Sequence, residues 1–566
     1  MMLVPITLSL FAASAFAAPA ADRLSERQSG PSVTIQNGTV VGSSALGVES
    51  FKGIPFAQPP VGPLRLKPPQ PITQSFGTLQ AVGIPDSCPQ FFLQIDTSTL
   101  AGDVISDLIS NPAVQAATQS SEDCLTLNVQ RPAGTTADSK LPVLFWMFGG
   151  GFEFGSNQLY DGTPFVSKSV DMGKDVIYVA INYRVGGFGF LAGQELQADG
   201  STNLGLRDQR LALQWVQDNI EAFGGDPEKV TIWGESAGAI SAFDQTVING
   251  GDNTYNGRPL FRAAIMNSGS IVPAQDVSSE KAQNIYNTVV QNAGCSGQSD
   301  TLACLRELST QDFLSAANSV PAIFGFRSLD LSYLPRPDPS SSFFSESPDA
   351  SVVAGRVAKV PIIIGDQEDE GTLFSLVQAN ITTDAALTAY LQSYFPATDP
   401  QTVADLVASY PSDAASGSPF RTGIANQIRP QYKRLAAILG DITFTLTRRV
   451  YLDLITPQIP AAYSYLNTYL FGTPILGTFH ASDVLVNFFS LLPVTADKTR
   501  QYYINFVADL DPNSAVPAGS PAWPQYTTTG RPLLQFAAGG IVTTGTDNFR
   551  QAQFETLAGS AASLRI

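Results

Sequence analysis

The chain has 566 residues, of which 44% are apolar and 14% are charged, and its formal net charge is −17. This apolar content excludes a disordered chain and predicts a large buried core. The acidic balance argues against binding to nucleic acids and against electrostatic attachment to anionic membranes. Because no linker-like composition, repeat or long charge block divides the chain, residues 19–566 are expected to form a single domain.

The N-terminal residues 1–18 are almost wholly apolar, carry no charged side chain and end in small residues, with Ala15-Phe16-Ala17 as a candidate cleavage motif. This pattern is typical of a signal peptide. No later stretch has the roughly 20 apolar residues that cross a bilayer, so the sequence predicts a secreted protein without a transmembrane anchor. Asn37 and Asn380 begin N-glycosylation sequons, which fits the same route.

The chain has four cysteines, which in an exported protein predicts two disulfides. Proximity in the sequence favours a Cys295–Cys304 pair and leaves Cys88 with Cys124, although three pairings are formally possible.

The loop from residue 88 to residue 124 contains an amphipathic segment. Leu100, Val104 and Leu108 recur at every fourth position, with polar residues on the other side, as on one face of a helix. Such a helix either packs permanently into the core or forms a lid that turns its apolar face towards lipid when it opens.

Patterns typical of strands and helices alternate through the middle of the chain. Continuous apolar runs at residues 141–148 and 176–181 indicate strands buried on both faces of a sheet. Residues 211–223 have the apolar spacing of a helix, which Gly224-Gly225 ends. Further strands are predicted at residues 230–233, 263–266, 360–364 and 463–470. The alternation predicts an α/β fold with a large, mostly parallel central sheet and helices on both faces.

The pentapeptide Gly234-Glu235-Ser236-Ala237-Gly238 directly follows the strand-like residues 230–233. A G-x-S-x-G motif between a strand and a helix is the sequence pattern of the nucleophile elbow, which presents the catalytic serine of α/β-hydrolases. A serine hydroxyl becomes a good nucleophile only when a base takes its proton and an acid holds that base in place. The sequence contains one histidine, His480, which is therefore the candidate base.

Two other segments could complete this site. Asp366, Glu368, Asp369 and Glu370 follow the predicted strand 360–364, where the acid of an α/β-hydrolase is expected, and chemistry alone does not choose among them. The run Gly149-Gly150-Gly151 follows the strand 141–148 and offers backbone N–H groups without Cβ atoms, and Ala237 supplies the amide just after the serine. Such amides are typical of an oxyanion hole.

These motifs resemble those of the type-B carboxylesterase/lipase family, which includes the cholinesterases. Residues 223–227 together with 234–238 match the serine signature of that family, and residues 122–129 match its second signature. The resemblance extends from about Val33 to the C-terminus. The chain is most similar to the secreted fungal lipase and sterol-esterase branch, on residues 146–153, 365–372 and 477–483.

The resemblance implies which residues form the site. The implied triad is Ser236, Glu370 and His480, and the implied oxyanion hole consists of the amides of Gly150, Gly151 and Ala237. It also supports the pairs Cys88–Cys124 and Cys295–Cys304, and a lid formed by residues 88–124.

The leading hypothesis is a secreted serine hydrolase for long-chain, water-insoluble esters, such as triacylglycerols or sterol esters, acting at a lipid–water interface without a metal or cofactor. One alternative is a carboxylesterase for short, soluble esters. Another is a non-catalytic binding module, which is disfavoured because all three triad residues are present. An exposed apolar lid would also allow self-association.

Overall fold

The computed structural model describes residues 30–91 and 119–566. The expected signal peptide, residues 1–18, lies outside the described residues. So do residues 92–118, which make up most of the expected lid loop.

The described residues form one large sheet of eleven strands. From one edge to the other, its strands are β16 (Ile541–Thr546), β15 (Pro532–Ala537), β14 (Ala462–Asn467), β13 (Ile362–Gln367), β12 (Ala263–Asn267), β9 (Gly225–Glu235), β7 (Leu141–Met147), β8 (Ile177–Ile181), β6 (Thr126–Pro132), β4 (Val48–Pro55) and β3 (Ser43–Ala45). The strands from β15 to β8 run parallel to one another, whereas β16, β6, β4 and β3 pair antiparallel.

Two smaller sheets lie outside the main one. They contain β1 (Ser32–Ile35), β2 (Gly38–Val41) and β5 (Gly77–Gln80), and the pair β10 (Thr254–Tyr255) and β11 (Arg258–Pro259).

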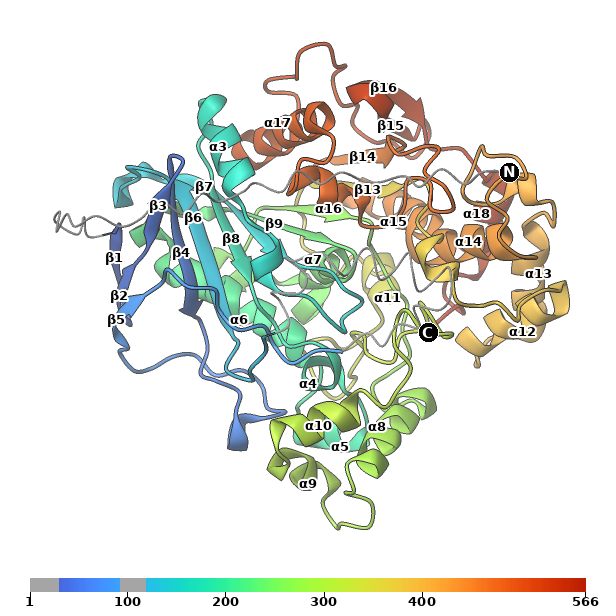
Figure 1. The fold of residues 1–566 in the computed structure, drawn as a ribbon, viewed down its shortest axis with the longest axis horizontal. Coiled ribbons are helices and arrows are strands. Elements are labelled where there is room, and N and C mark those ends of the chain that lie inside the picture. Colours follow the sequence, from blue (N-terminus) through green and yellow to red (C-terminus); the bar gives the residue numbers. More distant parts are fainter. Residues whose placement is uncertain (1–29, 92–118) are drawn as a thin grey trace, which may run out of the picture.

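The helices of the described residues pack around the main sheet (Figure 1). They are α3 (Thr163–Asp171), α4 (Gly186–Phe190), α5 (Gln194–Asp199), α6 (Leu204–Asn219), α7 (Ala237–Val247), α8 (Glu280–Asn292), α9 (Thr301–Glu307), α10 (Thr310–Ala317), α11 (Pro348–Val353), α12 (Asp384–Tyr394), α13 (Pro400–Ser409), α14 (Tyr432–Gly440), α15 (Leu446–Ile455), α16 (Ser482–Asn487), α17 (Pro493–Asp509) and α18 (Gln551–Ser560).

The alternation of side chains along each strand divides the core between the two faces of the sheet. On β7, Phe145 packs into one hydrophobic cluster and Trp146 into another, because successive side chains of a strand point to opposite faces. Helices α6 and α7 contribute to the first cluster, and α3 and α17 to the second. Both faces are therefore covered, which confirms the predicted mostly parallel sheet with helices on both sides and explains why the strands read as continuous apolar runs.

Two disulfides join segments around the sheet. Cys88 is bonded to Cys124, which precedes β6, and Cys295, just after α8, is bonded to Cys304 in α9. These are the pairs that proximity in the sequence favours.

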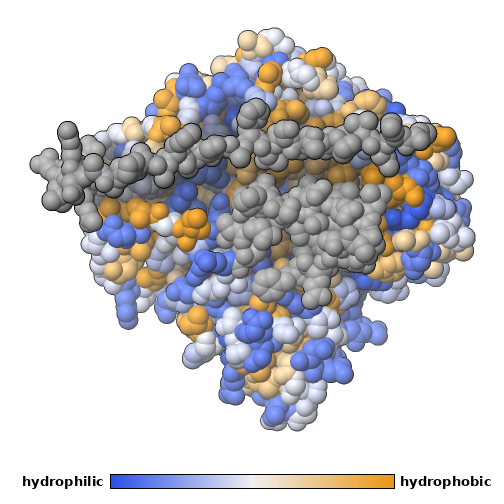
Figure 2. Space-filling model, in the orientation of Figure 1, coloured by the Kyte–Doolittle hydropathy of each residue, from blue (hydrophilic) through white to orange (hydrophobic). Residues whose placement is uncertain are grey.

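On the face of the molecule shown in Figure 2, hydrophobic residues form patches among hydrophilic ones. Within residues 30–91 and 119–566, no helix is both long enough and apolar enough to cross a bilayer.

Candidate active site

Ser236 lies at the sharp turn between the end of β9 and the start of α7. Its backbone angles are φ 56° and ψ −124°, a conformation that costs energy for a residue with a side chain and is often kept at functional sites. The turn also brings α7 against the end of β7. A Cβ atom built on Gly238 would lie 2.1 Å from the carbonyl oxygen of Met147, so this position of the pentapeptide requires glycine.

Ser236, His480 and Glu370 form a continuous hydrogen-bonded chain. The Oγ of Ser236 lies 2.8 Å from Nε2 of His480, and Nδ1 of the same ring lies 2.5 Å from Oε2 of Glu370. The second carboxylate oxygen of Glu370 accepts a 2.7 Å hydrogen bond from the backbone N–H of Gln367. With the proton of the imidazole on Nδ1, Nε2 is free to accept the proton of the serine hydroxyl.

The sheet brings these three residues together although they are distant in sequence. Ser236 follows β9, Glu370 follows β13 and His480 follows β14, and these strands are parallel and close neighbours in the order β9, β12, β13, β14. Their carboxyl ends therefore meet at one edge, where open α/β sheets bind ligands.

The environment of His480 favours a protonated ring more than water does. Burial lowers the pKa of His480. The facing Glu370 carboxylate, followed by Glu235 and Asp483, raises it by more than burial lowers it, so the pKa is about 9. Glu235 itself lies 3.4 Å from Nε2, and burial raises the pKa of its carboxyl to about 8. Burial thus favours the neutral form of Glu235, and Glu370, at 2.5 Å from Nδ1, is the carboxylate placed to stabilise the imidazolium.

The loop after β7 lies against the serine. A Cβ atom built on Gly149 would lie 2.9 Å from the Cβ of Ser236. Gly151 has φ 61°, and a Cβ atom there would lie 2.4 Å from Cδ1 of Ile323, so a larger residue would displace this loop. The amides of Gly150, Gly151 and Ala237 are thus on the two segments that flank Ser236, as an oxyanion hole requires.

The structure distinguishes the four acids that the sequence left equivalent, because Glu370 contacts His480 and the other three bind elsewhere. Asp366 pairs with Arg448 at 2.6 Å, Glu368 pairs with Arg421 at 2.7 Å, and Asp369 accepts hydrogen bonds from the Ser418 hydroxyl and from the backbone N–H groups of Phe420 and Thr478.

Two buried residues near the triad were not identified from the sequence. Gln367 fixes Glu370 through its backbone N–H, and its side-chain oxygen accepts hydrogen bonds from Tyr469 and Ser482. Glu153, two residues after Gly151, accepts a 2.9 Å hydrogen bond from the N–H of Ile323, and burial raises the pKa of this carboxyl to about 8. The position of Gln367 between the acids could have drawn attention to it, but no sequence pattern marks Glu153.

The two sequons differ in exposure. Asn380 is exposed, whereas Asn37 is half-buried and its side-chain amide donates to the carbonyl oxygens of Ile72 and Gln74. In the described part of the chain, no three His, Cys, Asp or Glu side chains are grouped so that they could hold a metal ion.

Comparison with known proteins shows similarity to carboxylesterases and lipases along nearly the whole chain. The model of the "Carboxylesterase family" matches residues 29–554. "Secreted lipase 1" of Botryotinia fuckeliana is 52% identical over 100% of this chain and 99% of its own length, and "Secreted triacylglycerol lipase LIP1" of Gibberella zeae is 52% identical over 97% and 93%. Among solved structures, Aspergillus niger EstA has a TM-score of 0.79 and 26% identity, covering 94% of this chain and 99% of its own.

Proposed function

The chain belongs to the carboxylesterase family, and we propose that it hydrolyses long-chain carboxylic esters through a triad of Ser236, His480 and Glu370. The single observation that carries this proposal is the unbroken hydrogen-bonded chain from the serine hydroxyl through the imidazole to the buried carboxylate. Such a chain activates a serine for attack on an ester carbonyl.

The proposed reaction proceeds in two halves. His480 takes the proton of Ser236 as Oγ attacks the ester carbonyl, and Glu370 stabilises the imidazolium that forms. The amides of Gly150, Gly151 and Ala237 donate to the developing oxyanion. His480 then protonates the leaving alcohol, and a water molecule activated by the same imidazole hydrolyses the acyl-enzyme.

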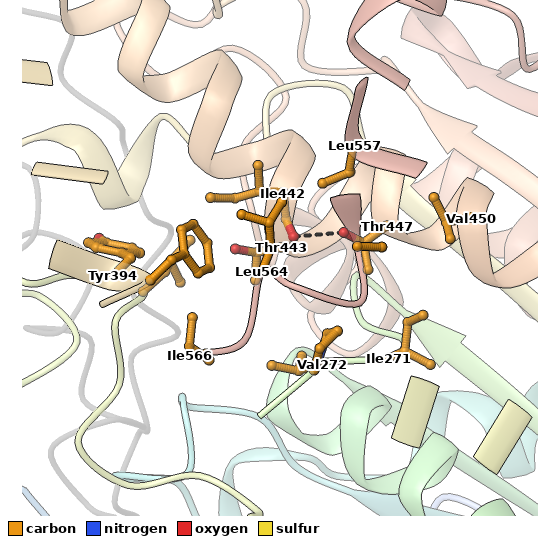
Figure 3. A pocket seen from close by; sticks show the side chains of 14 residues that line it. Ile271, Val272, Tyr394, Ile442, Thr443, Thr447, Val450, Leu557, Leu564 and Ile566 are labelled. Atoms are coloured by element: carbon orange, nitrogen blue, oxygen red, sulfur yellow. Dashed lines mark hydrogen bonds between the residues drawn. The ribbon is translucent and has the colours of Figure 1, made fainter. Parts of the chain in front are cut away.

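Two adjoining apolar cavities support a substrate with a long acyl chain. The first begins at Ser236 and is lined by Ile240, Leu331 and other apolar residues. The second lies beside it, and Figure 3 shows the side chains of Ile271, Ile442 and their neighbours around it. The residues that line both cavities are Val272, Leu329, Thr443 and Ile566. Because they share these walls, the cavities adjoin, and we propose that the acyl chain extends from the first into the second.

The second cavity is apolar although threonines line it. Thr447 uses its hydroxyl to donate a 2.6 Å hydrogen bond to the carbonyl oxygen of Ile442, as Figure 3 shows. The cavities measure about 30 and 40 Å³, so a long chain can enter only if side chains on the walls move apart. A mostly apolar lining of this kind suits a fatty acyl chain.

The relatives that are similar over nearly their whole length support the proposal of a secreted lipase. Both named above are called secreted lipases, and one is called a triacylglycerol lipase. We therefore infer that this protein is exported and acts on water-insoluble esters at a lipid–water interface. Residues 92–118, where a lid was expected, lie outside the described residues and carry no part of this inference.

The test is to compare initial hydrolysis rates on emulsified triolein, cholesteryl oleate and tributyrin, with Ser236→Ala as the blank. We expect turnover of at least one long-chain ester, lost in the serine variant. Turnover of tributyrin alone would favour the carboxylesterase for short esters. If the serine variant were as active as the wild type, the proposed mechanism would be wrong.

A further inference from the structure

One acidic residue, Asp244, lies in the wall of the apolar cavity that begins at Ser236. Ser236, Ile240 and Asp244 are spaced four residues apart, at the start of α7 and along it, and all three line this cavity. Residues at this spacing share one face of a helix. Since a helix rises 1.5 Å per residue, Asp244 lies about 12 Å along the helix axis from the serine.

Asp244 is buried and has no partner. Its side chain is 1% exposed, and neither Oδ1 nor Oδ2 forms a hydrogen bond with any described residue. Burial raises the pKa of this carboxyl well above its ordinary value, with no charged neighbour contributing. Burial thus favours the neutral acid, which can donate one hydrogen bond and accept another.

Other buried aspartates of the described residues form ion pairs or hydrogen bonds, whereas neither carboxylate oxygen of Asp244 does. Asp208 pairs with Arg184 at 2.7 Å, and Asp547 pairs with Arg449 at 2.5 Å. A buried polar group without a partner destabilises the folded state, so an unpaired one in a binding cavity requires an explanation. At Asp244 the cavity itself provides one, because a ligand that enters it can supply the missing partner.

We propose that Asp244 recognises an oxygen substituent on the acyl chain of the substrate, so that the enzyme prefers fatty acyl esters with a hydroxyl group near the middle of the chain. This proposal rests on the proposed function and specifies its acyl group. A neutral hydroxyl fits better than a charged group, because the remaining lining is mostly apolar and would not solvate a charge. The position follows from the distance between Ser236 and Asp244, which a chain bound at the serine spans with its first half.

The experiment measures kcat/KM for two matched nitrophenyl esters, of stearate and of a stearate with a mid-chain hydroxyl. It uses the wild type, Asp244→Asn and Asp244→Leu. We expect the wild type to prefer the hydroxylated ester by about two- to tenfold, the value of one hydrogen bond. Asp244→Asn should keep part of this preference because its amide still forms hydrogen bonds. Asp244→Leu should abolish it and should melt at the same or a higher temperature.

The wild type alone provides a second measurement in case a variant fails to fold. Its preference should be largest for the mid-chain hydroxyl and absent for a hydroxyl at the methyl end. Equal kcat/KM for all hydroxyl positions, or an unchanged preference in Asp244→Leu, would overturn the assignment of Asp244. If the wild type hydrolysed neither the plain nor the hydroxylated ester, the proposed function itself would fail.

Discussion

Replacing Glu370 with glutamine removes the negative charge beside His480 but keeps the shape of the side chain. Burial lowers the pKa of His480, and the carboxylate 2.5 Å away raises it, to about 9 in total. A hydrogen bond to a charged group contributes about 1.5–3 kcal/mol, and about 1.4 kcal/mol corresponds to one pH unit. We therefore expect the pKa of His480 to fall by about one to two pH units in Glu370→Gln.

The sign of the pH effect follows from the role of His480 as a base. Only the neutral ring accepts the serine proton, so activity is lost as the pH falls through the pKa of His480. A lower pKa keeps the ring neutral at lower pH, and the acid limb of kcat/KM should move to lower pH in the variant. At the plateau, the rate should still fall by about 10⁴-fold, because the amide no longer holds the imidazole in the tautomer that accepts the serine proton.

The measurement is a pH-stat titration of tributyrin hydrolysis over the pH range in which circular dichroism shows a folded protein. Asp369→Asn is the matched control, because this carboxylate accepts hydrogen bonds from Ser418, Phe420 and Thr478 and does not contact His480. The control should be less stable but keep the acid limb of the wild type. An unmoved limb in Glu370→Gln, or an equal shift in the control, would show that the Glu370 carboxylate does not raise the pKa of His480.

Four further predictions follow from the same geometry. His480→Ala leaves no other imidazole in the chain, so turnover should fall by about 10⁴–10⁶-fold, and retention of more than a few per cent would contradict its role. Gly151→Ala puts a Cβ atom 2.4 Å from Ile323 and should lower kcat by about 10²–10³-fold with an unchanged circular dichroism spectrum; a normal kcat would remove Gly151 from the oxyanion hole. Leu329→Trp fills the wall shared by the two cavities and should lower kcat/KM for triolein by about tenfold or more while sparing tributyrin; an equal loss on both esters would mean that acyl chains do not take this path. Asp547→Ala leaves the buried Arg449 without its carboxylate and should cost about 3–5 kcal/mol in urea unfolding, whereas a loss below about 1 kcal/mol would show that the pair contributes little.

Much of the parallel sheet could be predicted, because its strands are buried on both faces. The apolar runs predicted at residues 141–148 and 176–181 correspond to β7 and β8, and the run at 263–266 corresponds to β12. The strand β15 and the antiparallel edge strand β16 were not predicted. In β16 exposed positions break the apolar run, since buried Val542 lies between exposed neighbours.

The start of the helix before the nucleophile elbow could not be located from the spacing of apolar residues. The expected helix at residues 211–223 begins earlier, as α6 from Leu204 to Asn219, and continues in a tighter 3₁₀ turn to Phe223. The first turns of α6 are buried almost all round, so they have no polar face to mark the start of a helical pattern.

Part of the candidate site could be predicted from the sequence. Ser236 could be identified because it is the serine of a G-x-S-x-G motif that follows a strand. His480 could be identified because it is the one histidine of the sequence. Which acid faces His480 depends on how the loop after β13 folds, since each of the other three acids finds a different partner. Asp244 could not be recognised, because an acid in an alanine-rich helix gives no sign of whether it is solvated or buried without a partner.

The separation of the triad in sequence has a consequence for folding. Ser236 and His480 are 244 residues apart, and Glu370 and His480 are 110 residues apart, so the site forms only after β13 and β14 have joined the sheet. Contacts between such distant residues form slowly, because long loops must close first. A partly folded chain in which these contacts have not formed therefore holds the serine without its base and without the proposed activity. On refolding, the return of esterase activity would report the closure of contacts between residues 110 and 244 positions apart in sequence, later than any local structure.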